Sequence, residues 1–135
     1  MLTIDSPSEM QELGKKIGAK LRTGDVVALI GPLGAGKTEL TKGIGAAFGI
    51  TEITSPTFVI ARSYKTNPTF IHMDAYRLMA GSNPLAELED LDLNSESAIT
   101  IMEWGDLASH ISNEYLEIKI DRSDDIRKVE IIGHG

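Results

Sequence analysis

A glycine-rich loop between an apolar run and an amphipathic segment constrains this chain more than any other stretch. The loop reads Gly31-Pro32-Leu33-Gly34-Ala35-Gly36-Lys37-Thr38 and has the spacing G-x-x-x-x-G-K-[ST]. The five residues before it, 26–30, are all apolar, as in a strand that is buried on both faces. The apolar residues after it, at positions 40, 44, 47 and 48, recur at helical spacing. A strand, a glycine loop and a helix in this order predict a phosphate-binding loop.

The residue types of this loop suit the phosphates of a nucleotide. Glycines let the backbone curl so that successive N–H groups point at phosphate oxygens, and the following helix adds unpaired N–H groups and the positive end of its dipole. Lys37 is expected to reach the β- and γ-phosphates, and the Thr38 hydroxyl to bind Mg²⁺. The residues expected to bind the nucleotide here are Pro32, Leu33, Gly34, Ala35, Gly36, Lys37 and Thr38.

The composition is that of one globular domain covering residues 1–135. Hydrophobic residues make up 41% and charged residues 24%, both ordinary values. There is no cysteine, which excludes disulfides, thiolate metal sites and a cysteine nucleophile. The first residues lack the basic and long apolar regions of a signal peptide, and no apolar run reaches membrane-spanning length. We therefore expect a cytoplasmic protein with no membrane contact.

The charge balance is acidic, with a formal net charge of −7 at pH 7. Proteins that hold nucleic acid by its phosphates usually carry a basic patch. No cluster of lysine and arginine stands out in this sequence. If the chain works on a nucleic acid, we expect a partner to hold most of it.

The amino-terminal segment predicts a helix from about residue 7 to residue 22. Ser6 suits the N-cap, Pro7 the first helical position, and Glu9 completes an S-x-x-E capping box. Gly14 and Gly18 each cost about 1 kcal/mol relative to alanine inside a helix. Either another backbone approaches closely there, which we favour, or the helix is imperfect.

The rest of the chain alternates predicted strands with shorter helices. The strands share apolar or alternating patterns, at 26–30, 59–65, 69–74, 98–102, 116–120 and 128–131. A turn at Asn67-Pro68 joins two of them, and residues 121–127 are expected to connect the last two. Short helices are expected near 84–91 and 105–111. This order predicts an α/β fold, a three-layer phosphate-loop NTPase domain with a mixed central sheet.

Two acidic residues directly follow apolar strands, where α/β sheets bind their ligands. Glu103 is expected to organise Mg²⁺, and its alternative is a solvated carboxylate at a strand end. Asp74 is expected to support the magnesium or orient the attacking water, or else it caps or pairs locally. Thr57 is either a sensor of γ-phosphate and Mg²⁺ or a turn threonine. His72 has no second histidine or cysteine nearby, so we expect it in the core or behind a metal ligand rather than on a metal.

Four sequence elements together resemble the TsaE family, the bacterial ATPases of the tRNA threonylcarbamoyladenosine pathway. The resemblance covers nearly the whole chain, in order and at matching spacings. The phosphate loop is common to many enzymes, whereas the other three elements are specific. The four elements are the loop itself, Ser55-Pro56-Thr57-Phe58, His72-x-Asp74-x-Tyr76-Arg77-Leu78, and Glu103-Trp104.

The resemblance implies an activity and partners. Family members bind ATP, hydrolyse it slowly, and act with the TsaB and TsaD proteins. The pathway attaches a threonylcarbamoyl group to the adenosine next to the anticodon of tRNAs that read ANN codons. TsaD carries the transfer chemistry, and the resemblance implies that the ATPase resets the TsaB–TsaD complex between turnovers.

The resemblance also implies roles for particular residues. Thr38 and Glu103 would bind magnesium, and Asp74 would act near the γ-phosphate. Residues 55–58, with Thr57, would form a switch-like segment. Two further segments would approach the adenine, one around Pro7 and one around Arg127.

Two other functions remain open on sequence grounds. A small phosphate-loop kinase would pass the γ-phosphate to a metabolite, although such kinases usually close an arginine-bearing lid over the nucleotide. This chain has five arginines and no obvious arginine-bearing insertion. A nucleotide-gated binding module would change shape with ATP and hardly turn it over. GTP is not expected, because the chain has no N/T-K-x-D motif to read guanine.

Overall fold

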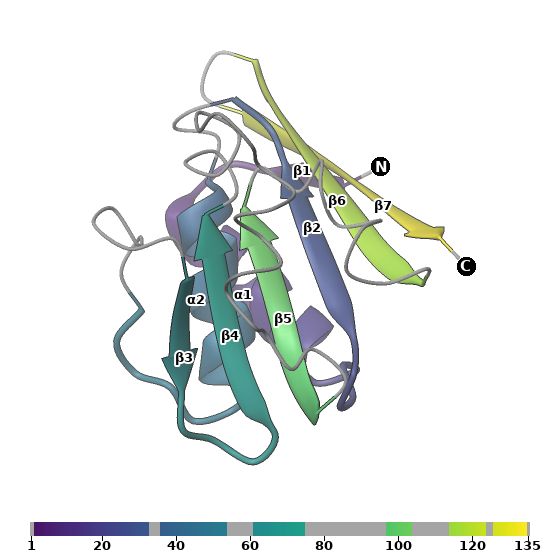
Figure 1. Ribbon diagram of the computed structural model, residues 1–135. Helices are drawn as coiled ribbons and strands as arrows, with labels where there is room; N and C mark the ends of the chain where they lie inside the picture. The colour runs from purple at the N-terminus through teal and green to yellow at the C-terminus, as the bar shows by residue number, and fades with distance from the viewer. Residues whose placement is uncertain are drawn as a thin grey trace.

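The described residues of the chain form a seven-stranded mixed sheet with two helices packed against it (Figure 1). The computed structural model describes residues 2–32, 36–53, 61–74, 97–103, 114–123 and 126–134. Its elements are β1 (Leu2–Ile4), α1 (Pro7–Gly18), β2 (Val26–Ile30), α2 (Lys37–Ala46), β3 (Ala61–Tyr64), β4 (Thr69–Asp74), β5 (Ala98–Glu103), β6 (Tyr115–Ser123) and β7 (Ile126–His134).

The strand order is β1-β7-β6-β2-β5-β4-β3, which confirms the predicted mixed sheet. The four central strands, β6, β2, β5 and β4, are mutually parallel, whereas β3, β7 and β1 pair antiparallel with their neighbours. The carboxyl ends of β2, β5 and β4, drawn as arrowheads, therefore lie at the same end of the sheet (Figure 1). The glycine loop leaves β2 at this carboxyl edge, which is where such sheets bind ligands.

Both faces of the central strands are buried, as the unbroken apolar runs predicted. Successive side chains of β2 point to opposite faces, yet Val26, Val27, Ala28 and Leu29 are all at most 2% exposed. One face packs against the helices in a single cluster that includes Leu40 of α2. The loop therefore begins from a rigid, fully packed strand.

Helices α1 and α2 lie on the same face of the sheet (Figure 1) and approach each other through glycine. A Cβ added to Gly14 would lie 2.8 Å from the Ile44 nitrogen and 2.9 Å from the Gly43 Cα. A Cβ added to Gly18 would lie 2.7 Å from the Cβ of Ala47. These contacts confirm that a second backbone comes close to both glycines, as we expected from their spacing.

The predicted first helix was four residues too long. Ser6 caps it as predicted, with its Oγ accepting from the Glu9 N–H at 3.1 Å. The helix ends at Gly18, and the chain then tightens into i→i−3 bonds such as Leu21 N–H to Gly18 O. Leu21 packs against the core from this turn, which explains why the apolar pattern continues beyond the helix.

The last hairpin is longer than predicted, and strand β1 was not predicted at all. Residues 121–123 pair with 126–128, so the connection is shorter than the 121–127 that we expected. The charged residues Asp121, Arg122 and Lys128 are exposed on these paired strands. β1 has three residues, too few for any periodic pattern. The Asn67-Pro68 turn does join β3 to β4.

Several predictions fall outside the described residues, among them the helices near 84–91 and 105–111. Within the described ranges, no helix is long and apolar enough to cross a membrane.

Candidate nucleotide and magnesium site

The glycine loop ends at Gly36, which starts helix α2. Gly36 has φ +108°, a left-handed conformation that side chains rarely adopt, and a Cβ there would lie 3.1 Å from the Met10 Cε. Its carbonyl accepts the first helical bond, from the Leu40 N–H at 2.9 Å. The first N–H groups of a helix have no partner within it and carry the positive end of its dipole. The start of α2 is thus suited to an anion.

Lys37 is the first residue of α2 and is almost buried, at 5% exposure. Its Nζ donates to the carbonyls of Gly31 at 2.6 Å and Pro32 at 3.0 Å. The ammonium therefore lies against the first residues of the loop. The loop is where the sequence predicts that phosphates bind, and a buried positive charge there attracts them strongly.

Thr38 and Glu103 meet although they are 65 residues apart in the chain. The Thr38 hydroxyl donates to Glu103 Oε1 at 3.3 Å. Glu103 is 5% exposed, so the alternative of a solvated carboxylate at a strand end is wrong. Its position follows from the sheet, because Glu103 ends β5 in register with Leu29 of β2.

This pair has the chemistry that magnesium requires. Hydroxyl and carboxylate oxygens are the ligands that Mg²⁺ prefers, usually one or two from the protein with phosphate and water completing six. In the part of the chain that the structure describes, no group of three histidine, aspartate or glutamate side chains could hold a metal by itself. Thr38 and Glu103 therefore fit a magnesium ion that phosphate oxygens help to bind.

The second oxygen of Glu103 contacts a buried histidine. His72 Nε2 lies 2.5 Å from Glu103 Oε2, and His72 is fully buried. Its Nδ1 has no hydrogen-bond partner among the described residues. The sequence placed His72 in the core or next to a metal ligand, but it does not predict this contact, because nothing in it indicates that β4 pairs with β5.

The other predicted site residues fall into three groups. Asp74 ends β4, and its Cα is in register with that of Glu103, so its backbone lies at the carboxyl edge. Pro7 begins α1 just after β1, and Arg127 pairs with Ile4 of β1, which brings both segments to the same edge. Outside the described residues lie Leu33, Gly34, Ala35 and Thr57.

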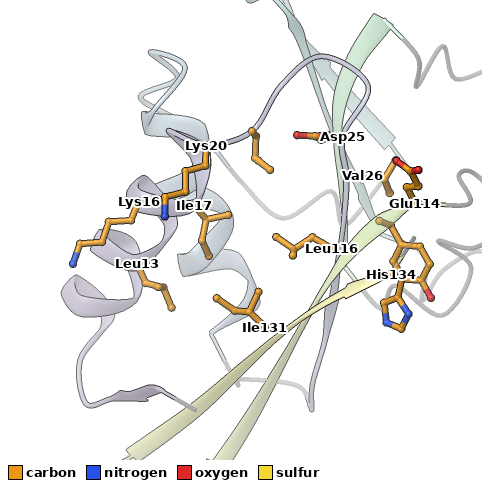
Figure 2. Close-up of a pocket in the computed structure, with 12 residues that line it drawn as sticks. Leu13, Lys16, Ile17, Lys20, Asp25, Val26, Glu114, Leu116, Ile131 and His134 are labelled. Atoms are coloured by element: carbon orange, nitrogen blue, oxygen red, sulfur yellow. The ribbon is translucent and has the colours of Figure 1, made fainter.

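The chain also has a groove of about 620 Å³ that is not this site. It lies between α1 and the β6–β7 hairpin, with Leu13, Ile17, Leu116 and Ile131 among its lining residues (Figure 2). Asp25 and Val26, at the amino end of β2, also line it. The groove is therefore at the opposite end of the sheet from the glycine loop.

The site combines a buried parallel strand with a glycine loop, a helix that starts at the lysine and a carboxylate on the neighbouring strand. This combination defines a phosphate-loop NTPase. A sequence model of the family described as "Threonylcarbamoyl adenosine biosynthesis protein TsaE" matches residues 4–129. The chain belongs to the TsaE family, which confirms the resemblance found in its sequence.

Individual relatives match this chain over most of their length. A protein named tRNA threonylcarbamoyladenosine biosynthesis protein TsaE, from Streptomyces coelicolor, is 40% identical and covers 93% of this chain and 91% of its own. The protein of the same name from Bacillus subtilis is 37% identical and covers 96% of this chain and 83% of its own. The crystal structure of Bacillus subtilis YdiB superposes with a TM-score of 0.80 at 32% identity, over 99% of this chain and 84% of that one.

Proposed function

We propose that this chain binds ATP with Mg²⁺ at the glycine loop, hydrolyses it slowly, and so supports threonylcarbamoyladenosine modification of the tRNA adenosine next to the anticodon. The observation that carries the proposal is the hydrogen bond between Thr38 and Glu103. It joins a hydroxyl of the loop helix to a buried carboxylate of the next strand, which is the oxygen pair that a phosphate-bound magnesium needs. The names of the relatives from Streptomyces coelicolor and Bacillus subtilis indicate the pathway.

Each site residue has a distinct part in binding. Lys37, held over the start of the loop, neutralises phosphate charge in a buried setting. The N–H groups at the start of α2 donate to phosphate oxygens. Thr38 and Glu103 would hold the magnesium, which would supply positive charge to neutralise the charge that develops on the phosphates.

Hydrolysis needs a group that orients the attacking water, and Asp74 is our choice. Its backbone lies next to Glu103 in the register of β4 and β5. Thr57 is proposed to sense the γ-phosphate. We expect slow hydrolysis by the isolated chain, because the sequence offers no clear arginine finger of its own and we assign that arginine to a partner.

The partners proposed are the TsaB and TsaD proteins, in the cytoplasm. The chain has a net charge of −7, so we assign most of the tRNA contact to these partners. ATP binding and hydrolysis here would reset the TsaB–TsaD complex between turnovers.

The test is reconstitution of tRNA threonylcarbamoylation with TsaB and TsaD. We expect repeated turnover with the wild-type chain, and none when the chain is omitted or carries Lys37→Ala. Lys42→Ala is the matched control, because Lys42 lies on the same helix but pairs with Glu39 at 3.2 Å. Full modification without the chain, or with Lys37→Ala, would contradict the proposal.

ATP consumption in the same mixtures separates hydrolysis from phosphoryl transfer to a metabolite. An ATPase releases free phosphate and ADP in equal amounts. ADP formed without free phosphate, and only when an acceptor is present, would indicate a kinase instead.

A further inference from the structure

We propose that His72 is a positioning residue of the magnesium site, which holds the Glu103 carboxylate so that Oε1 stays at Thr38. This inference rests on the proposed function of the same site. It is carried by two contacts that the single carboxylate makes on its two oxygens.

The two oxygens of the Glu103 carboxylate contact different residues. Oε2 lies 2.5 Å from His72 Nε2, and Oε1 accepts from the Thr38 hydroxyl at 3.3 Å. A carboxylate can only accept hydrogen bonds, so the imidazole must donate from Nε2. A bond to one oxygen fixes the rotation of the carboxylate, and the other oxygen is thereby aimed at the start of α2.

His72 is itself held in place. It lies in the middle of β4, which pairs with β3 on one side and with β5 on the other. Two residues earlier, Phe70 packs against Phe48 and Tyr64, with ring centroids 6.0 and 5.9 Å away. A fully buried ring on a strand with neighbours on both sides has little freedom to move. It can therefore orient Glu103 in a way that a flexible side chain would not.

Packing alone does not account for a histidine at this position. His72 is fully buried, and its Nδ1 has no partner among the residues that the structure describes. A buried polar atom without a hydrogen bond destabilises a fold, and a leucine of similar size would avoid this. Among the described residues, the ring makes one hydrogen bond in return, to the predicted magnesium ligand Glu103.

Some residues orient a metal ligand through a hydrogen bond without contacting the metal. Removing such a residue typically lowers metal affinity about 10- to 100-fold. We therefore expect His72→Leu to raise the Mg²⁺ concentration needed for tight nucleotide binding by about tenfold or more. Binding of the nucleotide in EDTA should be unchanged, because Lys37 and the helix terminus are intact.

The experiment titrates a non-hydrolysable ATP analogue into the full chain over a range of Mg²⁺ concentrations and in EDTA. His72→Gln is the conservative variant, since the glutamine amide nitrogen is as many bonds from the Cα as histidine Nε2. We expect His72→Gln to need nearly the same Mg²⁺ concentration for tight nucleotide binding as the wild-type chain. If His72→Leu does not fold, His72→Asn takes its place, because its amide is one bond too short to reach Glu103.

A double-mutant comparison separates positioning from general damage to the core. In a Glu103→Gln background, His72→Leu should have almost no further effect on the Mg²⁺ titration. An equally large effect in that background, or a wild-type titration curve for His72→Leu alone, would overturn the positioning role. A wild-type chain whose nucleotide affinity does not respond to Mg²⁺ would instead overturn the magnesium site, and the role of His72 with it.

Discussion

At the scale of single residues, the types of the site residues follow from the sequence, whereas their contacts do not. Gly36 has a left-handed φ because it ends a phosphate-binding loop, and a loop of this type has glycine at that place. The two oxygens of Glu103, by contrast, contact residues 65 and 31 positions away. No local pattern contains that information, and His72 was therefore expected only as a core or supporting histidine.

One residue contact makes stability depend on pH. Gln11 Nε2 donates to Glu39 Oε2 at 2.5 Å, and this bond, aided by Lys42, holds the pKa of Glu39 below its ordinary value of 4.5. A carboxyl whose pKa is lower in the folded state stabilises the fold above its unfolded pKa. That contribution is lost as the pH falls through the folded pKa.

We expect Gln11→Ala to lower the free energy of unfolding by about 1 kcal/mol at pH 7. The difference from wild type should shrink as the pH falls from about 4.5 through the lower pKa that Glu39 has in the folded wild-type protein. Urea unfolding at several pH values measures both effects. Lys15→Ala is the control, because its exposed pair with Glu12 contributes little. A difference that does not change with pH would contradict this account.

At the scale of elements, periodicity and caps located the longer helices and strands, but element ends depended on packing. Helix α1 stops at Gly18 although its apolar pattern runs to Leu21, which reaches the core from a turn. The spacing of Gly14 and Gly18 predicted a close neighbour. Only the structure identifies that neighbour as α2.

Gly14→Ala tests this helix contact. The new Cβ would meet backbone atoms of Leu40, Gly43 and Ile44, which cannot move aside as a flexible side chain would. We expect the free energy of unfolding to fall by about 1–3 kcal/mol, despite the better helix propensity of alanine. Gly133→Ala is the control, because a Cβ there has nothing within 4 Å. Equal stability of the two variants in urea would show that α1 and α2 can separate at little cost.

At the scale of the whole molecule, the proposed site exists only in the folded sheet. Its parts follow β2, β4 and β5, which are parallel neighbours and end at one edge. Mg²⁺ and ATP would therefore bind the folded chain and not the unfolded one. Such a ligand stabilises the fold by mass action.

We expect Mg²⁺-ATP at 100 times its dissociation constant to stabilise the fold by about 2.7 kcal/mol. Thermal unfolding should show a higher midpoint with the nucleotide, and Lys37→Ala should lose most of this shift. Lys42→Ala should keep it, since Lys42 pairs with Glu39 away from the loop carbonyls. A shift of equal size in Lys37→Ala would place the nucleotide elsewhere on the chain.

The sequence by itself determined the features that depend on near neighbours. These are the phosphate-binding loop with its flanking strand and helix, the Ser6 cap, the alternating strands and the family. The tertiary structure decided the strand order, the β1–β7 pairing and the Thr38–Glu103–His72 contacts. Turns, helix caps and the hydrophobic repeats of helices and strands arise from interactions over a few residues. Sheet order and site contacts arise from pairings between distant segments, which are selected by the packing of the whole core.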